Sequence, residues 1–138
     1  MNRRTLKHSS ARHAEATIES VIALEEQVWK AAQQRDLVGF RRLVPADAVM
    51  IFQSGIMPQP DYVTTMLERT ISHYELRNMR GFMPAPNTVI LIYEATRAGS
   101  FRGKIFPPGP VIESTTWVLR DGCWVAVLNQ ETRVAVEK

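Results

Sequence analysis

The first part of the chain repeats apolar residues at a helical spacing. Apolar side chains recur every three or four positions between Ala14 and Arg35, and charged or amide side chains fill many of the positions between them. One face of an α-helix collects residues at this spacing, so the segment predicts an amphipathic helix. The apolar stripe consists of Ile18, Val21, Leu24 and Val28, and Trp29 widens it.

Two shorter helices are expected after this one. Asp36 can cap a helix over residues 37–44, and Pro45 ends it because a proline disfavours helical backbone before it. Asp61 can cap a third helix that runs to about Ile71, since apolar side chains again follow a helical spacing there.

Strand signals dominate after Ser72. The segments there are rich in β-branched and aromatic residues and are separated by proline- and glycine-containing stretches. One earlier strand is expected over Ala48–Phe52, followed by a loop over residues 53–60. The prolines of Gly99–Pro110 predict a loop or a hairpin end. The later strands are His73–Met83, Thr88–Ala98, Val111–Arg120 and Cys123–Thr132.

The order of elements indicates one α+β domain. Helices precede a run of strands, and in such chains the helices cover one face of the sheet. A length of 138 residues also fits a single domain. We therefore expect residues 14–138 to form one domain, with three N-terminal helices packed on a curved, mostly antiparallel sheet.

The net charge of +3 comes from the first residues of the chain. Residues 1–13 hold four basic residues and no acidic one, whereas the remainder holds 13 basic and 14 acidic residues. The domain is therefore almost neutral, which argues against nucleic acid as a partner. We expect residues 1–13 to be a disordered basic leader.

The small numbers of cysteine and histidine residues, and the lack of a long apolar run, limit the kinds of protein and of site that we expect. Cys123 is the only cysteine, and no run of about 18 apolar residues is present. These features predict a cytoplasmic protein that does not span a membrane. His73 is the only histidine after residue 13, and no glycine-rich phosphate loop is found. We expect neither a metal site nor a cofactor.

The Asp-Gly turn at 121–122 predicts how the last two strands pair. A two-residue turn places Trp117 opposite Ala126 and Glu113 opposite Gln130. Directly paired residues share a face of the sheet. The face that the helices are expected to cover carries Glu113, Thr115, Trp117, Leu119, Trp124, Ala126, Leu128 and Gln130.

The opposite face is aliphatic at one end and small and polar at the other. Aliphatic residues on an uncovered face indicate a partner subunit, so a homodimer through this face is expected. A bulge near residue 129 would exchange Gln130 with its neighbours. Without a bulge, the opposite face carries Ile112, Ser114, Thr116, Val118, Val125, Val127, Asn129 and Glu131.

Carboxylates are the strongest candidates for chemistry. Glu94 interrupts the apolar run VILIYEAT, so its side chain lies either on an exposed face or deliberately buried. A buried carboxyl group can act as a general acid or base near neutral pH, which makes Glu94 the candidate catalytic residue. The candidate ligand-binding residues are Trp29, Phe52, Tyr62, Met66, Glu113, Thr115, Trp117 and Gln130.

Two sequence stretches carry a resemblance to a known family. The segment RDLVGFRRLVPADAVMIF and the later motif WVLRDGCWVAV resemble the nuclear transport factor 2-like superfamily. Within it, the chain is most similar to SnoaL-like and ketosteroid-isomerase-like small domains over residues 14–133. The resemblance implies a cone-shaped, cystatin-like α+β barrel, a pocket between sheet and helices, and homodimers formed through the sheets.

Several functions are compatible with such a pocket, because one fold supports many chemistries. The first hypothesis is a pocket for a small, largely apolar or mixed-polarity ligand, with acid–base chemistry of an isomerase, cyclase or dehydratase. The alternatives are a non-catalytic ligand-binding protein and a dimerisation or interaction module.

Overall fold

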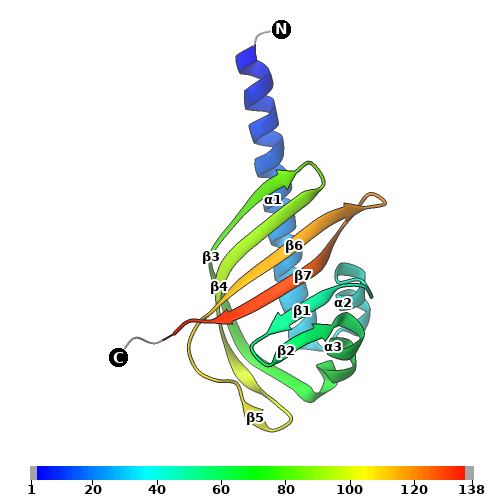
Figure 1. Ribbon diagram of the computed structural model, residues 1–138, viewed down its shortest axis with the longest axis vertical. Coiled ribbons are helices and arrows are strands. Elements are labelled where there is room, and N and C mark those ends of the chain that lie inside the picture. The colour runs from blue at the N-terminus through cyan, green and yellow to red at the C-terminus, as the bar shows by residue number, and fades with distance from the viewer. Residues whose placement is uncertain (1–2, 136–138) are drawn as a thin grey trace.

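The computed structural model describes residues 3–135 and shows helices packed against a strongly curled sheet (Figure 1). The helices are α1 (Arg3–Gln34), α2 (Leu37–Leu43), α3 (Gln59–Thr65) and the short 3₁₀ helix η1 (Met66–Glu68). The strands are β1 (Val49–Phe52), β2 (Gly55–Pro58), β3 (Arg69–Ala85), β4 (Thr88–Phe101), β5 (Lys104–Ile105), β6 (Val111–Arg120) and β7 (Cys123–Arg133).

The sheet is mixed and forms a half-barrel. Its strand order is β2-β1-β7-β6-β4-β3, and β5 extends the end of β4. The pairing of β1 with β7 is parallel and the other pairings are antiparallel. Helix α1 packs along β3 and β4, while α2 and α3 lie at the end of the sheet near β1 and β2. The expected α+β class, with three helices on a curved and mostly antiparallel sheet, is confirmed.

The hydrophobic core lies between α1 and the concave face. Val21 of α1, Leu91 and Tyr93 of β4, and Trp117 of β6 are each at most 2% exposed. Alternate residues of a strand point to opposite faces, which is why Leu91, Tyr93 and Ala95 all face the helix. This packing holds α1 against the concave face of the sheet.

The first helix is longer than its apolar stripe. It begins at Arg3 rather than near Ala14, so residues 3–13 are helical and not a disordered leader. The segment contains neither proline nor glycine, and nothing in it stops a helix that the packed stripe has started. In Figure 1 its N-terminal turns extend beyond the sheet. Residues 1 and 2 of the expected leader, and residues 136–138, lie outside the described part.

The region between β1 and β3 also differs from expectation. Residues 55–58 pair with β1 as a hairpin instead of forming a loop. Helix α3 starts at Gln59 after Pro58, so Asp61 lies within its first turn rather than capping it. The chain is already extended at Arg69, so Ile71 belongs to β3 and not to the third helix.

A bulge in β7 changes the predicted register of the last hairpin. The predicted pairing of Trp117 with Ala126 is confirmed, but the next pair is Thr116 with Leu128. Val127 is the extra residue, and an extra residue on one strand exchanges the faces of everything beyond it. The parallel partner β1 begins to pair with β7 at Leu128, directly after the bulge.

The consequence concerns three polar side chains of β7. Asn129 now lies opposite Thr115, and Glu131 opposite Glu113, on the concave side. Gln130 lies opposite Ser114 and is exposed. The register without a bulge, in which Gln130 faces inward while Asn129 and Glu131 face outward, is therefore wrong, and the alternative with a bulge near residue 129 is the one that the structure contains.

Candidate functional site

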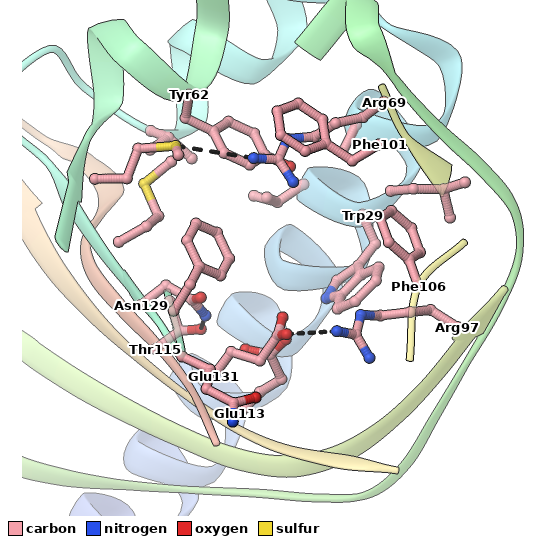
Figure 2. Close-up of a pocket in the computed structure, with 18 of the residues that line it drawn as sticks. Trp29, Tyr62, Arg69, Arg97, Phe101, Phe106, Glu113, Thr115, Asn129 and Glu131 are labelled. Carbon is pink, nitrogen blue, oxygen red and sulfur yellow. Dashed lines mark hydrogen bonds and ion pairs between the residues drawn. The ribbon is translucent and has the colours of Figure 1, made fainter. Parts of the chain in front are cut away.

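A cavity of about 590 Å³ opens between the concave sheet, α1 and the β4–β5 hairpin. This volume falls within the range of small-molecule sites. Its wall is mainly apolar and aromatic, and Figure 2 shows these side chains around a central space. Prominent among them are Val28, Phe40, Phe52, Phe101 and Phe106.

Five of the eight predicted ligand-binding residues line this cavity. They come from α1, β1, α3 and β6, and they are Trp29, Phe52, Tyr62, Glu113 and Thr115. The other three do not line it. Met66 and Trp117 are buried in the core beside the cavity, and Gln130 is exposed on the convex side. The sequence thus located the apolar wall better than the polar groups.

Glu94 lies outside the cavity. Its neighbours Tyr93 and Ala95 are buried on the concave face, so Glu94 points to the convex face and is exposed. A carboxylate in that position is solvated and cannot meet a molecule in the cavity. The hypothesis that Glu94 is the catalytic residue is therefore wrong.

A buried glutamate of helix α1 lines the cavity instead. Glu25 of α1 is 3% exposed and accepts hydrogen bonds from the Tyr93 hydroxyl at 2.9 Å and from Trp117 Nε1 at 2.8 Å. Trp29 Nε1 donates to the Tyr93 hydroxyl at 2.8 Å. Burial raises the pKa of Glu25, and the bonds from Trp117 and Tyr93 act in the opposite direction. This network joins the helix to the sheet and orients Trp29 at the cavity wall.

Glu113 is the most perturbed acid that lines the cavity. It is 2% exposed, and its Oε2 atom has no hydrogen-bond partner. Burial raises the pKa of Glu113 well above that of an ordinary carboxyl group, and the neighbouring charge of Glu131 raises it further. Glu113 therefore keeps a proton over a range in which an exposed glutamate is ionised.

Glu131, which lies beside Glu113, is paired with an arginine. Arg97 of β4 donates to Glu131 Oε1, and both side chains are largely buried. The guanidinium of Arg97 also lies 5.5 Å from the centre of the Phe106 ring, and its Nη1 atom has no partner. A carboxyl group whose pKa is raised by burial, next to one that is paired with an arginine, is an arrangement suited to acid–base chemistry.

The polar floor is completed by a side-chain amide. Asn129 Nδ2 donates to Thr115 Oγ1 at 2.9 Å, across the pairing that the bulge creates. Thr115 is 2% exposed, so this bond is shielded from water. The bond fixes the orientation of the Asn129 amide at the cavity floor.

An arginine lies at the other end of the cavity, among aromatic rings. The Arg69 guanidinium carbon lies 4.2 Å from the ring centre of Phe101, 5.0 Å from Tyr62 and 5.7 Å from Phe52. Its Nη2 atom contacts the Met57 sulfur at 3.9 Å. Figure 2 shows Arg69 opposite the Glu113 and Glu131 side chains across the cavity.

Sequence reasoning missed five polar residues of this site: Glu25, Arg69, Arg97, Asn129 and Glu131. Glu25 left a signal, because it lies four residues from both Val21 and Trp29 and therefore on the apolar stripe. A charged residue on such a stripe is buried with partners or in a site. The other four residues face the cavity only because of where the strands begin and end and where the bulge lies.

Within residues 3–135, no cluster of three or more histidine, cysteine, aspartate or glutamate side chains could hold a metal ion. In the same part of the chain, no helix combines the length and the hydropathy that crossing a membrane requires.

No protein-family model matches the sequence, and no curated protein matches it. The fold has many structural relatives. An NTF2-like protein from Cytophaga hutchinsonii is similar with a TM-score of 0.78 at 15% identity, over 97% of this chain and 100% of that one.

Two other solved structures carry functional names. A proposed dehydratase of the NTF2-like family from Streptomyces avermitilis is similar with a TM-score of 0.74 at 12% identity, over 88% of this chain and 99% of that one. The association domain of the Caenorhabditis elegans kinase CaMKII is similar with a TM-score of 0.72 at 13% identity, over 87% of this chain and 98% of that one. These likenesses show that the chain has the NTF2-like, α+β cone fold.

Proposed function

We propose that this protein binds a small, largely apolar molecule in the cavity between α1 and the concave sheet. The observation that carries the proposal is the cavity of about 590 Å³, whose aromatic and aliphatic wall meets a few buried polar groups. Small-molecule sites have this composition, because the apolar wall supplies affinity and the polar groups orient the ligand.

Acid–base chemistry on the bound molecule is the form of catalysis that the polar groups support. Burial raises the pKa of Glu113 and so favours its protonated form, and Glu131 beside it is paired with Arg97. One group can donate a proton while the other accepts one, which is what an isomerase, a cyclase or a dehydratase requires. Glu113 thus replaces Glu94 as the candidate catalytic residue, and one protein of similar fold is a proposed dehydratase.

Binding can be tested with a neutral fluorescent probe, N-phenyl-1-naphthylamine, whose emission rises in an apolar site. We expect saturable binding to the native protein. Ala32 of α1 lines the cavity, so Ala32→Trp should fill the space and weaken binding at least about tenfold.

The matched control is Ala23→Trp, which makes the same substitution at an exposed position of the same helix that does not line the cavity. This variant should bind the probe as the native protein does. Equal binding by both variants, or no saturable binding by the native protein, would contradict the proposed function.

A second candidate role is self-association through the convex face of the sheet. Large apolar side chains are exposed there, with Ile112 42% and Phe82 49% accessible. Exposed apolar side chains on a sheet face that no helix covers offer a surface for a partner subunit. One protein of similar fold is a kinase association domain, which adds support for this role.

Sedimentation velocity at micromolar concentration tests the homodimer. Ile112→Arg should convert a dimer into a monomer, because it places an unpaired charge in the interface. Ile105→Arg is the matched control, since Ile105 is 83% exposed on β5, away from the convex face. A monomeric native protein would refute this role.

A further inference from the structure

The charged groups of the cavity do not balance one another. Arg97 is neutralised by Glu131, and Glu25 is held by its two donors, Tyr93 and Trp117. Glu113 is buried, and its burial raises its pKa well above the ordinary value of a carboxyl group. Among the described residues no carboxylate pairs with Arg69, although this arginine lines the cavity. The cavity therefore has an excess of positive charge at the Arg69 end.

The surroundings of Arg69 leave its donors without a strong acceptor. Phe101, Tyr62 and Phe52 surround the guanidinium, an arrangement that stabilises a cation electrostatically but accepts no hydrogen bond in its plane. The Nε atom is buried without a partner, and Nη2 contacts the sulfur of Met57, which is a weak acceptor. A buried guanidinium nitrogen without an acceptor is costly, so an acceptor from outside the chain would be favourable.

We infer that Arg69 binds the carboxylate of a small organic acid whose apolar body fills the rest of the cavity. The inference rests on the proposed function and specifies the chemical class of its ligand. The planar guanidinium matches a carboxylate through two parallel hydrogen bonds along its edge. The aromatic rings around it leave these donors free, because a ring face accepts no hydrogen bond in the guanidinium plane.

A singly charged group fits this end of the cavity better than a phosphate does. Lys104 and Arg133 also line the cavity, but both are exposed, so the second negative charge of a phosphate at Arg69 would lack a buried cationic partner. At the opposite end, burial raises the pKa of Glu113 and so favours its uncharged form, which does not repel an anion. An acid bound at Arg69 would direct its apolar body towards Glu113, as the opposite positions of the two residues in Figure 2 indicate.

Displacement of N-phenyl-1-naphthylamine by matched probes tests the inference. Naphthalene-2-carboxylate and 2-naphthamide share an apolar body and differ in charge. We expect the carboxylate to bind the native protein about tenfold or more tightly than the amide, because hydrogen bonds to charged groups are the stronger ones. The dianion 2-naphthyl phosphate should bind more weakly than the carboxylate.

Substitutions assign the preference to one side chain. Arg69→Gln should bind acid and amide equally, and Arg69→Lys should keep a reduced preference, because it retains the charge without the planar pair of donors. Arg77→Gln is the matched control on the same strand, and its side chain is 52% exposed outside the cavity. It should behave as the native protein does. If Arg69→Gln does not fold, the Arg69→Lys result decides the assignment.

The outcomes separate the two proposals. Equal binding of acid and amide by the native protein, or an unchanged preference in either Arg69 variant, overturns the inference and leaves the cavity proposal intact. Tighter binding of the phosphate overturns the carboxylate class. Failure of the neutral fluorescent probe to bind overturns the proposed function and, with it, the inference.

Discussion

Two glutamates on neighbouring strands of the same sheet have opposite environments. Glu94 of β4 pairs with Ile112 of β6, and Glu113 is the next residue of β6, opposite Tyr93. Glu94 is exposed on the convex face, whereas Glu113 is 2% exposed on the concave face. A difference of one position along a strand thus decides whether a carboxyl group is solvated or takes part in a cavity.

The two faces of the sheet differ in the same way as these two glutamates. The concave face holds the hydrogen-bonded network of Glu25, the Glu113 and Glu131 pair, and the cavity. The convex face holds aliphatic side chains and solvated polar ones. Buried polar groups are costly unless they are paired, so substitutions on the concave face should have larger effects than matched substitutions elsewhere.

The largest effect is expected at Glu25. Glu25→Ala leaves the Tyr93 hydroxyl and Trp117 Nε1 without an acceptor and opens a void in the core. We expect the free energy of unfolding to fall by about 3 kcal/mol, measured by urea denaturation. Glu26→Ala, at the exposed neighbouring position, should change it by less than about 0.5 kcal/mol. Equal effects of the two variants would show that the network does not stabilise the fold.

The pH dependence of stability should identify Glu113. Its pKa is raised in the folded state from an ordinary value of 4.5. A carboxyl group with a raised folded pKa stabilises the protein fully below the unfolded pKa, and that contribution is lost as the pH rises towards the folded pKa. Above pH 4.5 the native protein should therefore lose stability relative to Glu113→Gln, by about 1.4 kcal/mol per pH unit while the group titrates.

Urea denaturation of both proteins at pH 5, 6 and 7 measures this difference. Glu94→Gln is the matched control on the convex face and should change stability by less than about 0.5 kcal/mol at any of these values, because the side chain is exposed. A difference between native protein and Glu113→Gln that stays constant with pH would mean that Glu113 is not protonated in the folded state.

A smaller effect is expected from adjacent threonines. Thr115→Val removes the acceptor of the Asn129 amide on the concave face and should cost about 1 kcal/mol of unfolding free energy. Thr116→Val makes the same change on the convex face and should have little effect, since a β-branched residue suits a strand. If Thr116→Val costs as much, the register that places Asn129 opposite Thr115 is wrong.

The sequence predicted the architecture because the spacing of apolar residues and the residue types of a turn are properties of short segments. The helical stripe of α1, the alternation of β4 and the Asp-Gly turn each follow from a few neighbouring residues. The turn gave the pairing correctly as far as Trp117 with Ala126. Beyond that point the register depends on the bulge at Val127, and no turn residue marks this position in the sequence.

The polar residues of the site were harder to predict because they depend on contacts between distant segments. The apolar spacing continues to Ile71 and therefore predicts that Arg69 lies in the third helix. In the structure, Arg69 is instead the first residue of β3. Glu131 lies on the convex face only in the register without a bulge, and no residue type near position 129 shows which of the two registers forms. The aromatic wall was predicted more successfully, because Trp29, Phe52 and Tyr62 belong to elements whose apolar faces the sequence marks.

The most direct test of the cavity on the concave face is a titration with 2-naphthamide followed by the indole N–H resonances of ¹⁵N-labelled protein. Trp29 lines the cavity, whereas Trp124, which is half-buried near the β6–β7 turn, does not. The account predicts that the Trp29 signal shifts to saturation while the Trp124 signal stays in place. A shift of the Trp124 signal with Trp29 unchanged would contradict it.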